Sequence, residues 1–111
     1  MTTTYKNKTT EDLIHNLCDV LEQKARQQTY GNQIIYFWFS IGKKYYKIIR
    51  ADYDTKNSSV HAFIDKITGD VYKPASWNNP YKDARYNINN DYDKLITDCD
   101  WAGRYLYKYG N

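Results

Sequence analysis

Residues 33–53, QIIYFWFSIGKKYYKIIRADY, decide the fold of this chain. Two runs rich in branched and aromatic residues, 33–41 and 45–53, flank the short segment GKK. Such runs favour β-strands, and a short glycine-containing link favours a tight antiparallel hairpin. We expect Gly42 to take a positive φ in this turn. Period-two alternation assigns the second strand's side chains to opposite faces: Tyr46 and Ile48 on one, and Tyr45, Lys47 and Ile49 on the other.

The hairpin continues into further strands. Residues 59–67, SVHAFIDKI, have the composition of a third strand, and the turn ITGD leads to a short fourth strand, VYK, at 71–73. Strands joined by such short turns pair with their neighbours in sequence. The pattern predicts an antiparallel β-meander.

Helices are expected before and after the meander. Thr9 and Asp12 form a capping pattern, and apolar residues then recur at helical spacing to about Gln28, where Gly31 is expected to end the helix. Residues 91–99 predict a short helix capped by Asn90 or Asp91. Residues 101–110 close the chain as a final strand or as a further turn of helix broken at Gly103.

The predicted fold is α+β. It consists of the antiparallel meander, an N-terminal amphipathic helix packed on one face and a short C-terminal helix. Residues 1–111 form a single domain, of which 1–8 are a polar arm.

The composition excludes several classes of function. A net charge of +3 is too small for a stable complex with duplex DNA. No apolar run reaches the ~20 residues of a membrane helix, and the first residues lack the apolar stretch of a secretory leader. Cys18 and Cys99 have no metal-site spacing, so we expect buried free thiols, with a disulfide as the alternative. Neither His15 nor His61 has a partner at relay spacing, and no metal or cofactor is expected.

Residues 73–91, KPASWNNPYKDARYNINND, show neither a strand pattern nor a helix pattern. Long loops in small domains are usually functional or disordered, and the aromatic residues here argue against disorder. An indole can stack on a base, carboxamides can bind base or ribose edges, and guanidinium groups bind phosphate. We therefore predict a pocket for a small aromatic anion, with these candidate binding residues in the segment: Ser76, Trp77, Asn78, Asn79, Lys82, Arg85 and Asn87.

A structural role explains the same residues. Trp77 would then anchor the loop to the core, Asn87 would cap the turn before the last helix, and Arg85 would be solvated. Arg104, which lies between Trp101 and Tyr105, could reach a phosphate, stack on a ring or form a surface ion pair. Residue types alone leave these alternatives open.

Residues 60–88, VHAFIDKITGDVYKPASWNNPYKDARYNI, resemble a segment common in small phage-encoded proteins. The chain is similar to the Thoeris anti-defence family of the first type. That family's pocket uses a stacking aromatic, an asparagine ten residues later and an arginine seventeen beyond it; Trp77, Asn87 and Arg104 have this spacing. Trp77 replaces the phenylalanine of the best-known members. Arg26 is the counterpart of a further family arginine, and the N-terminal half carries no other family motif.

The resemblance implies a phage protein in the host bacterial cytoplasm that sequesters the cyclic ADP-ribose isomer of Thoeris immunity without degrading it. The adenine would lie on Trp77, Asn87 would bind the base or sugar, and Arg104 with Arg85 would neutralise the pyrophosphate. The family also implies a homo-oligomer, a dimer or a hexamer, and cyclic oligonucleotides at a second site.

Two other functions fit the composition. Aromatic residues interleaved with lysine and arginine are typical of a single-stranded nucleic-acid-binding module. A tyrosine-rich surface also suits a protein inhibitor of a host defence enzyme. A nucleotide-degrading enzyme has the least support, because no nucleophile lies at a recognisable spacing from a base.

Overall fold

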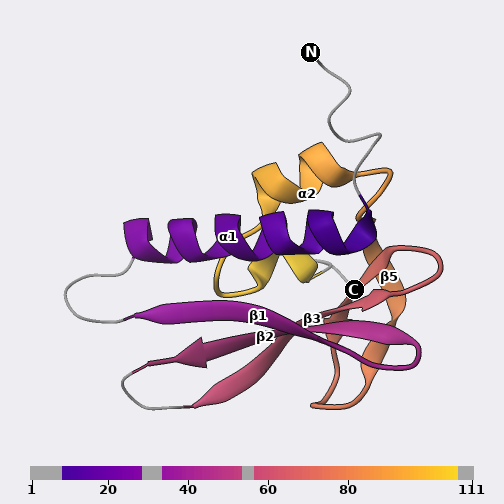
Figure 1. Cartoon of the computed structure of the whole chain (residues 1–111), viewed down its shortest axis with the longest axis horizontal. Helices are drawn as coiled ribbons and strands as arrows, with labels where there is room; N and C mark the ends of the chain where they lie inside the picture. Colours follow the sequence, from indigo (N-terminus) through magenta and orange to yellow (C-terminus); the bar gives the residue numbers. More distant parts are fainter. Residues whose placement is uncertain (1–8, 29–33, 54–56, 108–111) are drawn as a thin grey trace.

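The computed structural model describes residues 9–28, 34–53 and 57–107, which form an α+β fold. The elements in chain order are α1 (Thr10–Gln28), β1 (Ile35–Ile41), β2 (Tyr45–Asp52), β3 (Ser58–Asp65), β4 (Asp70–Pro74), β5 (Pro80–Asn87), α2 (Tyr92–Asp98) and the 3-10 turn η2 (Arg104–Leu106). The strands form one antiparallel sheet in the order β1-β2-β3-β4-β5. Both helices lie on the same side of this sheet (Figure 1). The expected meander and helix arrangement are confirmed.

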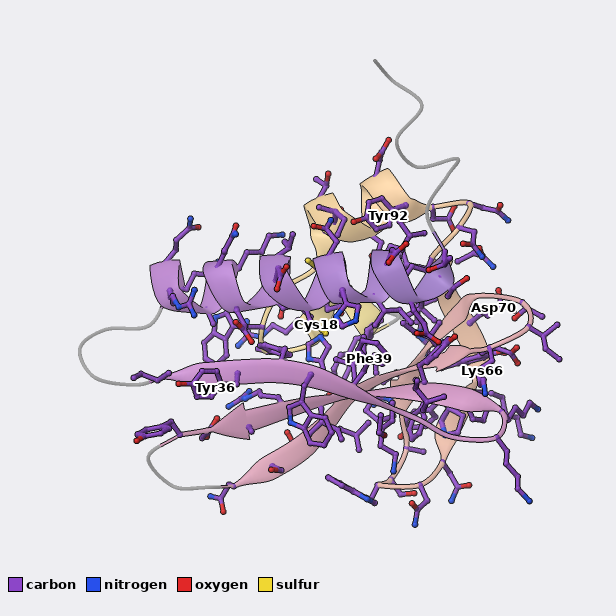
Figure 2. All side chains as sticks on the ribbon, viewed as in Figure 1. Cys18, Tyr36, Phe39, Lys66, Asp70 and Tyr92 are labelled. Atoms are coloured by element: carbon purple, nitrogen blue, oxygen red, sulfur yellow. The ribbon has the colours of Figure 1, made fainter. Side chains whose placement is uncertain are left out.

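Helix α1 begins with the capping box that its sequence predicts. The Thr9 hydroxyl accepts a hydrogen bond from the Asp12 N–H at 3.1 Å, and the Asp12 carboxylate accepts one from the Thr9 N–H at 3.2 Å. The apolar stripe of the helix packs on the sheet, and Figure 2 shows Cys18 and Phe39 between the two layers. The largest fully buried side chains of this core include Ile14, Leu17, Leu21, Ile48, Ile64, Ile88 and Leu95. The expected helix end at Gly31 lies outside the described residues, as does the arm 1–8.

The β1–β2 hairpin has the predicted faces and turns within the predicted GKK segment, but Gly42 does not have the predicted conformation. Phe39 pairs with Ile48 on the face that packs against α1, whereas Trp38 pairs with Ile49 on the other face. The predicted positive φ at Gly42 is wrong, because only Gly69 and Gly103 have positive φ among the glycines in the described parts of the chain. The Gly42 N–H donates to the Tyr45 carbonyl at 2.9 Å. Gly42 therefore continues the ladder.

Residues 73–91 are not one irregular loop, and that expectation is wrong. The end of β4, a turn over residues 75–79 and all of β5 occupy most of the segment. Pro74 pairs with Pro80 where β4 ends and β5 begins, which suits residues that have no N–H to donate. Strand β5 is at the sheet edge and its second to fifth residues are exposed, so it lacks the apolar alternation that would reveal a strand.

The last predicted strand is also absent from the described residues. Gly103 takes a φ of 87°, and the chain then forms the short η2 turn, as the helical alternative predicted. Asp91 occupies the N-cap position of α2, but its side chain does not cap the helix. One carboxylate oxygen of Asp91 instead accepts the Asn87 N–H at 2.8 Å.

Lys24 ties α1 to the C-terminal end of α2. Its ammonium group donates to the carbonyls of Ile96, Thr97 and Cys99 at 3.0, 3.1 and 2.6 Å. The last carbonyls of a helix have no partner within the helix and carry its negative dipole end, so a lysine is favourable there. A hydrogen bond between the Asn16 and Tyr92 side chains joins the same two helices.

The cysteines are as expected, since Cys18 and Cys99 are both buried free thiols. Burial raises the pKa of the Cys18 thiol to about 12, which keeps it protonated.

Within the described ranges, no helix is both long enough and apolar enough to cross a bilayer.

Candidate functional site

Trp77 lies in the hairpin turn between β4 and β5. The N–H groups of Ala75 and Ser76 both donate to the Asn79 carbonyl, at 2.8 and 3.0 Å, and these bonds hold the turn closed. The Lys47 ammonium lies 4.8 Å from the centre of the Trp77 ring, a cation–π contact. The ring is still 48% exposed, so a flat ligand can reach it.

A cleft of about 310 Å³ opens beside Trp77. The turn provides one wall and the first residues of β3 provide the other. Three of the lining side chains are hydroxyls, those of Ser58, Ser59 and Ser76. This Trp77 cleft thus pairs a stacking surface with hydrogen-bonding groups of the kind that a ribose or a base edge needs.

A second cleft, of about 140 Å³, lies against the C-terminal segment. Arg50 and Lys73 enter this Gly103 cleft from β2 and β4. The Lys73 ammonium lies 4.2 and 4.4 Å from the ring centres of Tyr81 and Tyr107. The Arg50 guanidinium lies 5.1 Å from the Trp101 ring and pairs with Asp52 at 3.4 Å.

The two clefts adjoin, because Ser59, Val60 and Pro74 line both. Among the residues that the structure describes, no carboxylate lines either cleft. The Trp77 cleft therefore offers an indole and hydroxyls, and the Gly103 cleft offers Lys73 together with Arg50, which is paired with Asp52. This distribution suits a ligand with an aromatic ring and an anionic group.

A protein-family model matches residues 2–108 of the chain. The chain is a member of a family of unknown function, DUF7717. No curated protein and no solved structure matches it. For this DUF7717 member, the local geometry is therefore the basis for any functional inference.

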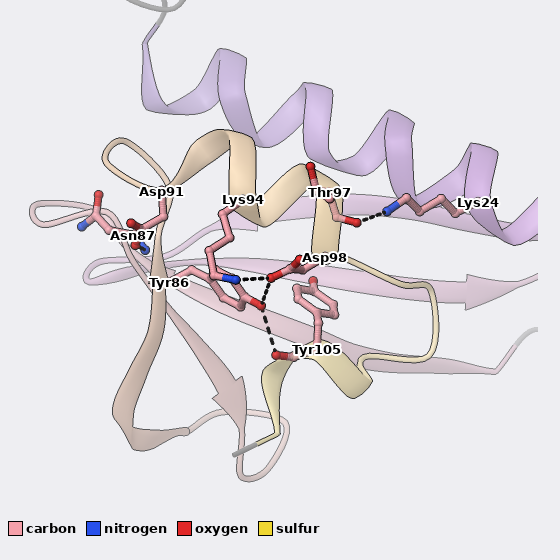
Figure 3. A network of polar contacts seen from close by, with 8 residues as sticks. All are labelled: Lys24, Tyr86, Asn87, Asp91, Lys94, Thr97, Asp98 and Tyr105. Atoms are coloured by element: carbon pink, nitrogen blue, oxygen red, sulfur yellow. Dashed lines mark hydrogen bonds and ion pairs between the residues drawn. The ribbon is translucent and has the colours of Figure 1, made fainter. Parts of the chain in front are cut away.

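In this DUF7717 chain, a polar network joins β5 and α2 to the C-terminal segment that follows Gly103 (Figure 3). The Tyr86 hydroxyl donates to the Asp98 carboxylate at 3.0 Å, and burial together with that carboxylate raises the pKa of Tyr86 to about 12. Asp98 also accepts from Lys94 at 2.9 Å. Asp100 then accepts the N–H groups of Arg104 and Tyr105, both at 3.1 Å, which starts the η2 turn.

His61 forms the floor of the same cleft. It is 6% exposed, and its Nε2 lies 2.7 Å from the Tyr105 hydroxyl. Gly103 passes close to the ring, since a Cβ at this position would lie 3.7 Å from Cε1 of His61. Burial is the main cause that lowers the pKa of His61 to about 4; nearby Arg50 lowers it further, whereas Asp100 opposes the shift. The imidazole is therefore neutral at neutral pH.

The buried His61 predicts a loss of stability in mild acid. The unfolded chain protonates this imidazole below pH 6.5, whereas the folded chain resists protonation until about pH 4. The free energy of unfolding should therefore fall across this window by about 3 kcal/mol from His61 alone. Urea unfolding at several pH values, compared with His61→Gln, measures this contribution. Parallel pH profiles for the two proteins would contradict the assignment.

The predicted binding residues do not all line the same cleft in this protein. Trp77 and Ser76 line the Trp77 cleft. Asn87 lies at the far end of β5, which at ~3.3 Å per residue places it roughly 20 Å away along the strand. Trp77 and Asn87 therefore do not line one cleft within a single chain.

The Asn87 carboxamide is fully used in its own turn. Its Nδ2 donates to the Thr68 carbonyl at 2.8 Å and to the Asp70 carboxylate at 3.0 Å. Its Oδ1 accepts the N–H groups of Asn89 and Asn90, both at 3.0 Å. A carboxamide has two donor hydrogens and two acceptor lone pairs, so none remains for a ligand. The structural alternative for Asn87 fits these contacts.

The three candidate arginines have different surroundings. Nε of Arg85 donates to the Leu106 carbonyl at 2.6 Å and one terminal nitrogen donates to the Asp83 carbonyl at 2.7 Å, so Arg85 anchors the C-terminal segment. Arg104 is exposed and directly follows Gly103, but it is not among the residues that line the second cleft. Arg26 is exposed on α1 and pairs with Glu22 at 3.7 Å, and it lines neither cleft.

Sequence reasoning missed Arg50 and Lys73. Each lies in a strand whose composition indicates only a half-buried surface. The pairing of β2 with β3 and of β3 with β4 brings them to one cleft, and the β2–β3 register is irregular between Ile48 and Ile49. A register assignment for the whole sheet would have been needed to find them.

Proposed function

We propose that this protein binds a nucleotide signal of the cyclic ADP-ribose type and sequesters it without degrading it. In this role it acts as a phage-encoded anti-defence protein in the host bacterial cytoplasm. The observation that carries the proposal is a pair of adjoining clefts, one beside the exposed Trp77 indole and the other lined by the cations Arg50 and Lys73, with no carboxylate among their described lining residues.

The surface suggests an orientation for the ligand. The adenine stacks on the Trp77 ring, and the ribose hydroxyls face the three serines of the Trp77 cleft. The diphosphate then lies in the Gly103 cleft, where Lys73 and Arg50 replace the predicted Arg85 as its partners. Arg104 directly follows Gly103 in the chain and adds a further positive charge to this segment.

The groups in the clefts favour binding over hydrolysis. Nε2 of His61 is engaged with Tyr105, and burial keeps the imidazole a weak base with a pKa of about 4. None of the three serines has an imidazole or carboxylate partner among the hydrogen bonds of the described residues. The protein therefore acts by mass action. Nanomolar capture corresponds to about −12 kcal/mol, and the stacking, hydroxyl and charge contacts must together supply it.

Binding and recovery of intact ligand test the proposal. The protein is titrated with cyclic ADP-ribose isomers by isothermal calorimetry and by native mass spectrometry, which also reports whether it is a homo-oligomer. The complex is then heat-denatured and the supernatant analysed by mass spectrometry. We expect submicromolar affinity and recovery of the unchanged nucleotide. Fragments in the supernatant, or no binding of any isomer, would overturn the proposal.

Lys73→Gln should weaken binding of the cyclic nucleotide about five- to tenfold. The reason is the loss of one charge-assisted hydrogen bond at a half-buried position, worth about 1 kcal/mol. Calorimetry with Lys73→Gln measures the loss, and Lys82→Gln, an exposed lysine on β5, is the matched control. Adenosine has no phosphate, so its affinity should not change. Equal weakening by both variants would show that only net charge matters.

A further inference from the structure

The face of the sheet opposite the helices carries its own cluster of aromatic residues. Ile49 and Phe63 are buried there, apart from the main core. Trp38 on β1 is 50% exposed on the same face, and Tyr36 beside it is also exposed. No helix covers this face in the part of the chain that the structure describes (Figure 1). The face is a half-open aromatic platform.

A cleft of about 190 Å³ lies between the β1–β2 turn and this platform. Three lysines line it: Lys43, Lys44 and Lys47. None of its lining residues within the described ranges is a carboxylate. Asp65 pairs with the lining residue Tyr45 in the sheet, and its Oδ1 accepts the N–H groups of Ile67 and Thr68 at 2.8 and 2.9 Å, so it is committed to its own turn. We call this cavity the lysine cleft.

Lys47 joins the lysine cleft to Trp77. Its ammonium lies 4.8 Å from the Trp77 ring centre and 5.9 Å from that of Phe63, and it donates to Oδ1 of Asn78 at 3.4 Å. Asn78 itself lines the lysine cleft. A phosphate in this cleft would therefore be next to a ring stacked on Trp77.

We propose that this face of the sheet binds single-stranded nucleic acid, with a backbone phosphate in the lysine cleft and a base stacked on Trp77. Lysines in a groove beside exposed aromatic rings are the two features that such binding requires. A duplex keeps its bases stacked inside the helix, so it cannot use the rings. The lysine cleft shares no lining residue with the two clefts of the nucleotide site. Trp77 is the residue on which both the proposed cyclic nucleotide and the proposed single strand stack a base.

Fluorescence anisotropy with labelled oligo(dT) and oligo(rU), alone and as duplexes, tests this inference. Lys43→Gln combined with Lys44→Gln should weaken oligonucleotide binding about tenfold at low salt. The slope of log affinity against log salt should become shallower by about 1.4, because each phosphate contact of a single strand contributes about 0.7. Lys82→Gln combined with Lys94→Gln removes the same charge outside the lysine cleft, and should have little effect.

The nucleotide site provides a second comparison. The double variant at Lys43 and Lys44 should retain cyclic nucleotide binding, whereas Lys73→Gln should retain oligonucleotide binding. The inference is overturned if oligonucleotides do not bind at low salt, if duplexes bind as tightly, or if the control pair weakens binding equally. It is also overturned if the double variant only alters self-association, which would assign the face to a second copy of the chain.

Discussion

Asn87→Ala is expected to lower the free energy of unfolding by about 2–3 kcal/mol. The substitution removes the four hydrogen bonds of the Asn87 carboxamide. Their partners are the Thr68 carbonyl, the Asp70 carboxylate and the N–H groups of Asn89 and Asn90. Each partly exposed bond is worth about 0.5–1 kcal/mol. For a domain of this size, the expected fall in melting temperature is about 10 °C. Urea unfolding and a thermal scan measure both quantities.

The turn around Asn87 has no simple way to compensate. Gly69 takes a φ of 82° there, and its carbonyl accepts the Ile88 N–H at 2.8 Å. Asn90→Ala is the control, because only the backbone N–H of Asn90 takes part in the contacts with Asn87. If Asn87→Ala were as stable as Asn90→Ala but lost nucleotide binding, Asn87 would be a ligand-binding residue after all.

Trp77→Ala should weaken binding of the cyclic nucleotide about ten- to hundredfold and leave the melting temperature nearly unchanged. Stacking of one base on an aromatic ring is worth about 1–3 kcal/mol. The ring is half exposed and belongs to a turn closed by backbone hydrogen bonds, so the fold does not depend on it. Calorimetry gives the affinity, and a thermal scan gives the stability. Oligonucleotide binding should fall in the same variant.

Two further variants sharpen the test of Trp77. Trp77→Phe keeps a stacking surface and should retain most of the affinity. Trp38→Ala removes a tryptophan of similar exposure, 50% against 48%, that lines neither cleft of the nucleotide site. Equal losses in Trp38→Ala and Trp77→Ala, or unfolding of Trp77→Ala, would contradict the assigned role of Trp77.

The elements with strong periodicity could be predicted from the sequence. The α1 stripe, the capping box at Thr9 and the β1–β2 hairpin are each specified by residues close together in the chain. Strand β5 could not be predicted in this way. Its edge position exposes Tyr81, Lys82 and Asp83, and no apolar alternation results.

The candidate site was predictable only in part. Trp77 and Ser76 stand out by residue type, and they do line a cleft. The role of Asn87 depends on which backbone groups the folded turn brings near it, and sequence spacing does not contain that information. The same limit applies to Arg50 and Lys73, which approach Gly103 only through the pairing of three strands and the position of the C-terminal segment.

The hydrogen bonds between Lys24 and the C-terminal end of α2 have a consequence for folding during synthesis. The helix that carries Lys24 leaves the ribosome early, but the Cys99 carbonyl that it binds is 75 residues further along the chain. At ~5–20 residues per second, translation of that interval takes roughly 4–15 s. Most of the stability of a protein helix comes from tertiary packing, and although the sheet can cover the apolar stripe of α1 earlier, the part of α1 that packs on α2 stays uncovered during this time. The nascent chain should therefore be a substrate for chaperones until the last helix has emerged.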